Sequence, residues 1–460
     1  MRFFGREAEQ LKLSQSIEAE RQTASLVYGR RRVGKSELIK HCLRESSARS
    51  IYFECRQTTE ASNVASLSAL ASESLGYPPL AFGGIEELLA FLFEQARGEK
   101  LVLVLDEYPY LRDAVKGMDS ILQALVDGHA DDSAMSLVLC GSIIDTMKSL
   151  LEEHNPLYGR FDLIIDLKPM DYRDSALFYP GFSDEDKVRM YSVLGGIPYY
   201  NRLVDDQLSV RDNIVELVAS PGARLENEVS MHLRSEMSKV TNANEVFEAL
   251  ATGAVKFGDI LSQSHVTSSP ALADVLDKLI RMELVRKTAP INDPNNKRRA
   301  GYRIADNLSA FYYRYVFRYA SQLSVMAPAA FYERFVARDF EEQYVPRAFE
   351  DVCKQYLIRQ NQAGAMAEPF FAIGKYYYDD PVAKRNGEFD VVTEDALGYI
   401  SYEAKFREKP LGRELVNVER AQVDASPLEC YRYGFFSRSG FDCEPREDEV
   451  FFSLDGMYRH

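Results

Sequence analysis

The sequence lacks the features that would place the protein in a membrane or outside the cell. None of its apolar runs approaches the roughly 20 residues that cross a bilayer. The opening MRFFGREAEQ has charges where a signal peptide has an apolar core. No CxxC pair occurs among the six cysteines, which indicates free thiols in a reducing compartment and gives no zinc signature. These absences predict a cytoplasmic protein without membrane contact.

The sequence also lacks an excess of basic residues, because 55 Lys and Arg stand against 70 Asp and Glu, for a net charge of −15. This balance excludes a protein coated in nucleic-acid-binding surface, so any contact with DNA is expected to be local. Hydrophobic residues make up 46% and charged residues 27%, ordinary values for a globular protein. A chain of 460 residues exceeds one typical core, so we expect several domains.

Residues 25–36, SLVYGRRRVGKS, carry the most specific motif. An apolar strand runs into a glycine-containing loop and then into ELIKHCL, which has helical spacing, and this context makes the loop a P-loop rather than a chance glycine turn. Lys35 would meet the β- and γ-phosphates of ATP, and Ser36 would hold Mg²⁺. The three arginine side chains are expected to be mainly solvated. The predicted nucleotide-binding loop consists of Gly29, Arg30, Arg31, Arg32, Val33, Gly34, Lys35 and Ser36.

Two further apolar strands are expected to end at the same phosphate crevice. LVLVLDEYPYL at 101–111 is continuously apolar up to Asp106 and Glu107, as a buried strand of a parallel sheet would be. Asp106 is expected to join the Mg²⁺ shell and Glu107 to polarise the attacking water, which predicts ATP hydrolysis as well as binding. SLVLCGS at 136–142 ends in Ser142, a candidate sensor of the γ-phosphate.

Together with the segments FFGREAEQLKL (3–13), PLYGRFDLIIDLKPM (156–170) and LGGIPYY (194–200), these motifs resemble the archaeal-type ATPase family of the STAND/AAA+ group over about the first half of the chain. The resemblance implies an AAA+-like ATPase core at 1–170 and a helical lid at 171–235. It also implies positions near the nucleotide base for Gly5, Arg6 and Glu7, and a lid opening at Gly195, Gly196 and Pro198. It makes Arg160 a candidate γ-phosphate sensor, against the alternative of a solvated surface arginine.

The pattern changes in the middle of the chain. Three short helical segments and a hairpin whose turn contains NDPNNKRR resemble a winged helix, expected at 236–320. Helix 269–282 would be the one able to enter a DNA major groove, with Lys297, Arg298 and Arg299 on the wing. Because acidic and basic residues are mixed on this helix, we expect it to pack against neighbouring domains rather than to read DNA.

The last part, 321–460, is predicted to be a connector followed by a domain with the element order of a PD-(D/E)xK nuclease. A helix that carries Glu350 precedes three strands, FFAIGKYYYDD, EFDVVTE and YISYEAKF, and a helix near 412–424 and two more strands follow. Glu403 and Lys405 share one face of their strand, and Asp390 on the preceding strand can lie beside them. The segment resembles the restriction-endonuclease-like domain found behind archaeal-type ATPases.

Two interpretations of this last part remain open at this level. In the first, Glu350, Asp390 and Glu403 hold a second Mg²⁺ or Mn²⁺, and Lys405 activates water for DNA cleavage. In the second, the chain is a nucleotide-regulated signalling or scaffolding protein, and the strands form a charged hairpin of an inactive nuclease-like module that only binds a partner. The sequence therefore predicts an α/β multidomain ATP-hydrolysing switch, with ATP and Mg²⁺ as ligands. Its candidate partners are DNA, another protein or a second copy of the chain.

Overall fold

The computed structural model describes residues 3–226, 228–229, 240–296, 298–380 and 385–459. The chain divides into two compact units, one formed by residues 1–169 with 197–199 and the other by 170–196 with 200–460. The segments expected to form the lid, the winged helix and the nuclease-like domain thus belong to the second unit, except for residues 197–199 of the lid. Within the described ranges, no helix has both the length and the apolar character needed to span a bilayer.

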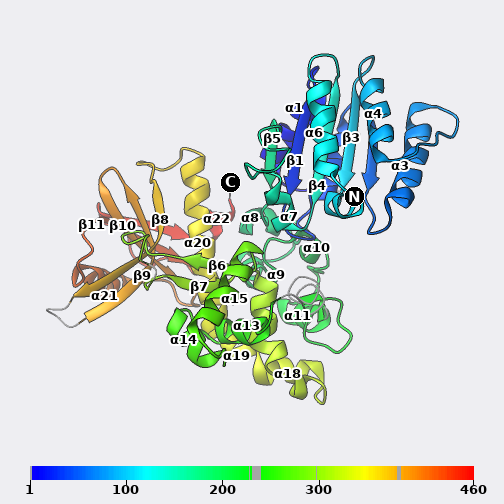
Figure 1. Cartoon of the computed structure of the whole chain (residues 1–460). Coiled ribbons are helices and arrows are strands. Elements are labelled where there is room, and N and C mark those ends of the chain that lie inside the picture. Colours follow the sequence, from blue (N-terminus) through cyan, green and yellow to red (C-terminus); the bar gives the residue numbers. More distant parts are fainter. Residues whose placement is uncertain (1–2, 227, 230–239, 297, 381–384, 460) are drawn as a thin grey trace. The chain divides into compact units, whose positions relative to one another are not determined.

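The first unit is built on a five-stranded sheet of order β2-β3-β4-β1-β5, in which every neighbouring pair is parallel (Figure 1). All residues of β1, β3 and β4 are buried, as expected for strands covered by helices on both faces. The strands are β1 (Thr23–Tyr28), β2 (Arg49–Glu54), β3 (Leu101–Asp106), β4 (Met135–Gly141) and β5 (Leu163–Asp166).

The helices of this unit alternate with its strands, which is the pattern that a parallel sheet requires. They are α1 (Glu7–Glu18), α2 (Lys35–Glu45), α3 (Glu60–Leu75), α4 (Ile85–Gln95), α5 (Tyr108–Ala114), α6 (Met118–Gly128) and α7 (Ile144–Ser149). One apolar core joins side chains from β2, β3 and β4 to α3 and α4. The strand order changes direction at β1, because β2, β3 and β4 lie on one side of it and β5 on the other. Ligands of open parallel sheets bind at such a point, outside the carboxyl ends of the strands.

The first part of the second unit is helical, with a two-stranded antiparallel sheet of β6 and β7. Three helices followed by this hairpin give the element order of a winged helix. The lid segment contributes α8 (Tyr172–Ala176), α9 (Asp184–Leu194) and α11 (Val210–Leu217), and the short helix α10 (Pro198–Asn201) follows α9. The segment expected to be a winged helix contains α13 (Ala243–Ala251), α14 (Phe257–Gln263), α15 (Ser269–Arg281), β6 (Val285–Thr288) and β7 (Gly301–Ile304).

A bundle of short helices joins this hairpin to the last domain. It includes two π-helical turns, η1 and η2, which widen the helix where aromatic side chains pack. Its members are α16 (Asn307–Phe311), η1 (Tyr312–Phe317), α17 (Ala320–Leu323), α18 (Pro328–Phe335), α19 (Ala337–Asp339) and η2 (Phe340–Tyr344), and they lead into the long helix α20 (Val345–Gln362).

The C-terminal sheet is mixed and has the order β12-β11-β10-β9-β8. Strands β8, β9 and β10 form an antiparallel meander, whereas β10, β11 and β12 pair in parallel, with α21 as the crossover between β10 and β11 (Figure 1). The elements are β8 (Ala372–Asp380), β9 (Arg385–Asp395), β10 (Gly398–Lys405), α21 (Arg413–Asp424), β11 (Cys430–Ser437), β12 (Glu449–Ser453) and α22 (Leu454–Tyr458). The order of helix, three strands, helix and strand expected from the sequence is present.

The hairpin loop between β6 and β7 is docked on strand β8, which is an edge strand of the C-terminal sheet. The backbone N–H of Ile291 donates to the carbonyl of Lys375 at 2.8 Å, and the Asn292 side chain exchanges hydrogen bonds of 2.7 and 3.1 Å with the backbone of Tyr377. The Arg299 guanidinium lies 4.3 Å from the centre of the Tyr377 ring. The contact covers the edge strand. Lys297, also placed on the wing, lies outside the described residues.

Gly196 is the position of the second unit that tolerates a side chain least. Its carbonyl accepts a hydrogen bond of 2.8 Å from the Met170 N–H, and a Cβ at this position would lie 1.8 Å from the Met170 carbonyl oxygen. Because the backbone fixes the Cβ position and the Met170 oxygen belongs to the backbone, no rotamer change relieves the clash. Gly196→Ala is therefore expected to destabilise the unit by roughly 3 kcal/mol or more.

Thermal denaturation measures this effect. Gly98→Ala is the matched control, because a Cβ at the exposed Gly98 would meet no atom within 4 Å. The control is expected to melt with the wild type. Equal midpoints for Gly196→Ala and Gly98→Ala would show that the close approach at Gly196 does not exist in solution.

Candidate functional site

The P-loop lies at the carboxyl end of β1, where the sequence places it. Gly29 has a φ of 151° and Gly34 a φ of 101°, both in the region that favours glycine. A Cβ at Gly29 would lie 2.3 Å from the carbonyl oxygen of Leu167, so only glycine fits this turn. Helix α2 starts at Lys35, and its free N–H groups point to the loop that would surround phosphates.

Lys35 is buried and has no carboxylate partner among the hydrogen bonds of the described chain. Its ammonium group donates to the carbonyl oxygens of Gly29 and Arg30, at 2.9 and 3.1 Å. Burial lowers the pKa of Lys35, and the nearby charges of Glu107 and Asp106 oppose that effect. A buried cation held only by backbone carbonyls is suited to receive an anion such as a phosphate.

Asp106 meets the P-loop directly, which brings the two motifs into one site. One of its carboxylate oxygens accepts a 2.7 Å hydrogen bond from the Ser36 hydroxyl, and the same oxygen accepts a hydrogen bond from Tyr52. Burial alone would raise the pKa of Asp106, but hydrogen bonds from Cys140, Tyr52 and Ser36 lower it, so the group stays ionised. A hydroxyl and a carboxylate at this separation are oxygen ligands of the kind Mg²⁺ prefers, and they fit the ion.

Glu107 follows Asp106 and contacts the end of β4. Both of its carboxylate oxygens lie 2.9 Å from the Ser142 hydroxyl, and the Ser142 N–H donates to one of them at 3.3 Å. Glu107 also adopts a left-handed backbone conformation, with a φ of 52°, which is uncommon for a residue with a side chain. The strand order explains the contact, because β4 lies between β1 and β3.

The structure distributes the predicted arginines over different positions. Arg6 is buried and donates to the Val33 carbonyl of the P-loop at 3.3 Å. Arg30 is buried rather than solvated, Arg31 is exposed, and the Arg32 guanidinium lies 4.1 Å from the centre of the Tyr199 ring. Of the three loop arginines expected to be mainly solvated, Arg30 therefore departs from the expectation.

Arg160 is not brought to the phosphate site. It precedes β5, which runs parallel to β1, so it lies at the amino edge of the sheet, whereas the P-loop follows the carboxyl end of β1. Its guanidinium binds both oxygens of Asp127, at 2.8 and 2.7 Å. The role of γ-phosphate sensor suggested for Arg160 is corrected accordingly, because a whole strand length separates the two edges.

Tyr52 is a site residue that the sequence did not reveal. It lies on β2, and its hydroxyl donates to the same Asp106 oxygen as Ser36 does. Burial and the Asp106 charge raise the pKa of this phenol, so it stays a hydrogen-bond donor. The strand RSIYFE gives no motif to signal this, and only the pairing of Tyr52 with Val104 in the sheet places the phenol near the carboxylate.

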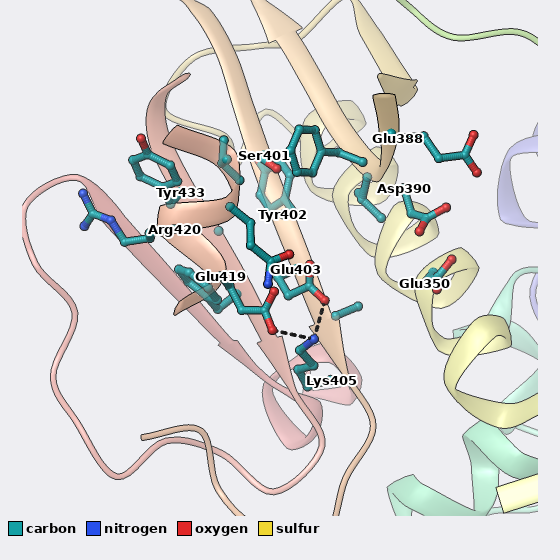
Figure 2. Close-up of a pocket in the computed structure, with 18 of the residues that line it drawn as sticks. Glu350, Glu388, Asp390, Ser401, Tyr402, Glu403, Lys405, Glu419, Arg420 and Tyr433 are labelled. Carbon is teal, nitrogen blue, oxygen red and sulfur yellow. Dashed lines mark ion pairs between the residues drawn. The ribbon is translucent and has the colours of Figure 1, made fainter. Parts of the chain in front are cut away.

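The C-terminal candidate residues line one pocket of about 340 Å³ in the last domain (Figure 2). Glu350 comes from α20, Asp390 from β9, and Glu403 and Lys405 from β10. The strand register accounts for the meeting, because β9 and β10 are antiparallel and their last pair is Val391 with Tyr402, so that Asp390, directly before Val391, and Glu403, directly after Tyr402, lie at the same end of the ladder. The topology thus assembles the four residues that the sequence selected.

Two lysine side chains form ion pairs with carboxylates of this pocket. Lys405 lies between Glu403 and Glu419, at 2.7 and 2.8 Å (Figure 2), and Lys375 binds Glu388 and Asp390 at 2.5 and 2.6 Å. Among the residues that the structure describes, no group of three or more His, Cys, Asp or Glu side chains is arranged to hold a metal. In the described residues, Glu350, Asp390 and Glu403 do not form such a group.

Burial and neighbouring charges shift the pKa values of the carboxyl groups in the pocket. Burial and the neighbouring Asp390 charge raise the pKa of Glu350 to about 7. Burial would raise the pKa of Asp390 as well, but the Lys375 charge lowers it. Burial raises the pKa of Glu403, whereas Lys405 opposes this. The sequence had not selected Lys375, Glu388 or Glu419, since nothing in their spacing shows that three elements bring them to Asp390 and Glu403.

These observations define a P-loop ATPase fold in the first unit. Residues 3–203 match a family described as an ATPase domain predominantly from Archaea, and residues 312–422 match a family of archaeal and bacterial proteins of unknown function. The first match covers the P-loop, the Asp106–Glu107 strand and the Gly195–Gly196 turn. The second covers α20, the strands β8, β9 and β10, and most of α21.

Proteins with similar sequences occur in Methanocaldococcus jannaschii. The uncharacterized protein MJECL04 is 27% identical over 391 residues, which is 85% of this chain and 84% of that protein. The uncharacterized ATP-binding protein MJ0147 is 23% identical over 293 residues, 52% of this chain and 76% of its own length. Among solved structures, the Walker-type ATPase PABY2304 of Pyrococcus abyssi superposes with a TM-score of 0.50 at 20% identity, covering 68% of this chain and 96% of that one. This last likeness concerns the fold.

Proposed function

We propose that this protein is a STAND/AAA+-type switch that binds ATP with Mg²⁺ and hydrolyses it. The observation that supports this most directly is the 2.7 Å contact between Ser36 and Asp106 beside the buried Lys35, at the strand edge where Glu107 also lies. In this assignment Lys35 leaves its two backbone carbonyls for the phosphates. Ser36 and Asp106 hold Mg²⁺, which neutralises phosphate charge when it is bound.

Glu107 is the proposed base of the reaction. Its carboxylate would accept a proton from the attacking water, and Ser142 would keep it oriented through the hydrogen bonds that they already share. Ser142 is thus a positioning residue in this proposal rather than a direct sensor of the γ-phosphate. Arg6 supports the P-loop through the Val33 carbonyl.

The proposed domains remain an ATPase core at 1–170, a lid at 171–235, a winged helix at 236–320 and a nuclease-like domain with its connector at 321–460. The docked hairpin loop suggests how the last two communicate, because Ile291 binds the backbone of the residue whose side chain reaches Asp390, namely Lys375. Nucleotide-dependent movement of the winged helix would change this contact. In other nucleotide switches, the bound nucleotide likewise orders a segment and its hydrolysis releases that segment.

We further propose that the nuclease-like domain binds a partner rather than cutting DNA. Two carboxylates expected to hold a catalytic metal, Asp390 and Glu403, are each neutralised by a lysine at 2.6 or 2.7 Å. A divalent ion would have to displace an ammonium group from a partly buried ion pair. Because the residues do not fit a metal as they lie, no cleavage step is assigned to them.

Thermal denaturation in Mn²⁺ without nucleotide tests this proposal. Every protein carries Asp106→Asn, so that the ATPase site contributes no metal binding. The melting midpoint is expected to stay within about 1 °C, because only an ion that binds the folded state stabilises it. Incubation of DNA with the protein and Mn²⁺ is expected to leave the DNA intact.

Three variants make the result decisive. Lys375→Met removes the ammonium group that Glu388 and Asp390 share. This protein is expected to gain stability from Mn²⁺, which would show that the assay detects a metal in this pocket. In the protein that keeps Lys375, stabilisation by Mn²⁺ that disappears with Asp390→Asn would instead establish a metal site, and DNA cleavage that disappears with the same change would establish a metal-dependent nuclease. Lys405→Ala would then lose cleavage and keep the metal.

A further inference from the structure

A second pocket, of about 460 Å³, gathers positive charge in the second unit. Its walls come from α9, α13, α16, α20 and the β6–β7 hairpin. Among its described lining residues, Asp351 is the only acidic one, and the basic ones are Arg286, Arg303, Arg314, Arg347 and Lys354. In a chain with a net charge of −15, such a local excess of cations is unusual.

Two of these cations stand directly opposite each other in the hairpin. Arg286 on β6 pairs with Arg303 on β7 in the antiparallel register, so their side chains lie on the same face. Like charges at opposed positions destabilise a strand pair. The hydrogen bond from Arg286 goes to the Ala305 carbonyl at 3.2 Å, and Arg303 reaches the Asp351 carboxylate only at 3.5 Å. An anion between the two guanidinium groups would relieve the repulsion.

Two carboxylates, Asp339 and Asp351, form ion pairs with the cations of the described lining, and they do not balance them. Asp339 binds Arg314 through two hydrogen bonds of 2.7 and 2.9 Å, which satisfies that residue. Asp351 is shared between Arg303 and Lys354, at 3.5 and 3.7 Å. Arg347 forms no ion pair with any residue in the described ranges. Positive charge therefore remains available to a ligand.

The cations also form a series from the rim of the pocket to its interior. Arg286 and Arg347 are exposed, whereas the side chains of Arg303 and Lys354 are 25% and 17% exposed. A single small anion would meet one or two of these groups. A ligand with several linked phosphates would meet all four.

This cationic pocket lies next to the acidic pocket of the nuclease-like domain, which is the one lined by Glu350, Asp390 and Glu403. Arg347, Asp351 and Lys354 lie on successive turns of α20, and Glu350 of the same helix lines the acidic pocket. The charges of Lys354 and Arg303 act on both Glu350 and Asp390. A nucleic-acid strand bound in the cationic pocket would thus run beside the acidic pocket of the domain that resembles a nuclease.

We propose that the cationic pocket binds the backbone phosphates of a nucleic acid, through Arg286, Arg303, Arg347 and Lys354. This inference rests on the proposed function of the last domain as a binding module, and it names the class of partner. Contacts to phosphates recognise no particular base, so the pocket binds nucleic acid without sequence preference. Binding is strongly weakened by salt, because each phosphate contact releases a counterion.

Fluorescence anisotropy with short fluorescein-labelled single-stranded and duplex DNA tests the proposal on the full chain, in EDTA and without nucleotide. Arg286→Glu and Arg347→Glu, both at exposed positions, are each expected to weaken binding about fivefold to tenfold. Each is also expected to reduce the dependence of log K on log salt by about one. Melting curves verify that the variants are folded.

Arg338→Glu is the matched control, because this arginine is 86% exposed and pairs with Glu342 outside the pocket. It is expected to bind DNA as the wild type does. Equal loss in all three variants, or no binding of either DNA by the wild type, would overturn the proposal. Inorganic phosphate that competes with DNA at equal phosphate concentration would show a small-anion site and overturn it too. ATP hydrolysis, measured on the same protein, separates failure of this inference from failure of the ATPase assignment.

Discussion

Lys35→Ala is expected to weaken ATP binding by about 100-fold or more. The wild-type ammonium group is buried, and within the described part of the chain its hydrogen-bond partners are the carbonyl oxygens of Gly29 and Arg30. Truncating one member of a buried, charged hydrogen-bonded pair costs a few kcal/mol, and 1.4 kcal/mol corresponds to a factor of ten. Equilibrium titration with ATP and Mg²⁺ measures the dissociation constant.

Lys12→Ala is the matched control for this experiment. Lys12 lies on α1 in the same unit, and its side chain is exposed. The control is expected to bind ATP with wild-type affinity. If the Lys35 variant is folded and its affinity lies within about threefold of the control, the loop from Gly29 to Ser36 does not bind phosphates in the way assigned to it.

Glu107→Gln is expected to keep ATP binding and to lower the rate of hydrolysis by about 100-fold or more. Glutamine has nearly the same shape, so the contact with Ser142 can persist, but a neutral amide cannot accept the proton of water. Phosphate release under single-turnover conditions measures the chemical step, and equilibrium titration measures binding. A variant that releases phosphate at the wild-type rate would remove Glu107 from the role of base.

Ser142→Ala separates the base from the residue that positions it. The change removes the hydroxyl that contacts both Glu107 oxygens but leaves the carboxylate in place. We expect a loss of about tenfold in the rate with unchanged ATP affinity, smaller than the loss for Glu107→Gln. A loss in affinity instead would indicate that Ser142 contacts the nucleotide itself.

The sequence by itself determined the P-loop ATPase fold of the first unit and where its two motifs lie. Residues 25–36 and 101–107 contain both the strands and the polar residues at their ends. Because phosphate binding depends on a backbone turn and on strand ends, these two short segments carry all of the signal that the motif needs. The element order of the last domain was also readable, since strand and helix periodicity depend on local pattern. The sheet and helices found there follow that order.

Only the tertiary structure decided which charges meet. Tyr52 joins Asp106 because β2 pairs with β3, and Arg160 is kept from the P-loop because β5 runs parallel to β1. Lys375 reaches Asp390 across the β8–β9 pair. Ion pairs and pockets depend on distances between residues far apart in the chain, and strand order and register set those distances. No local pattern of residue types contains that information.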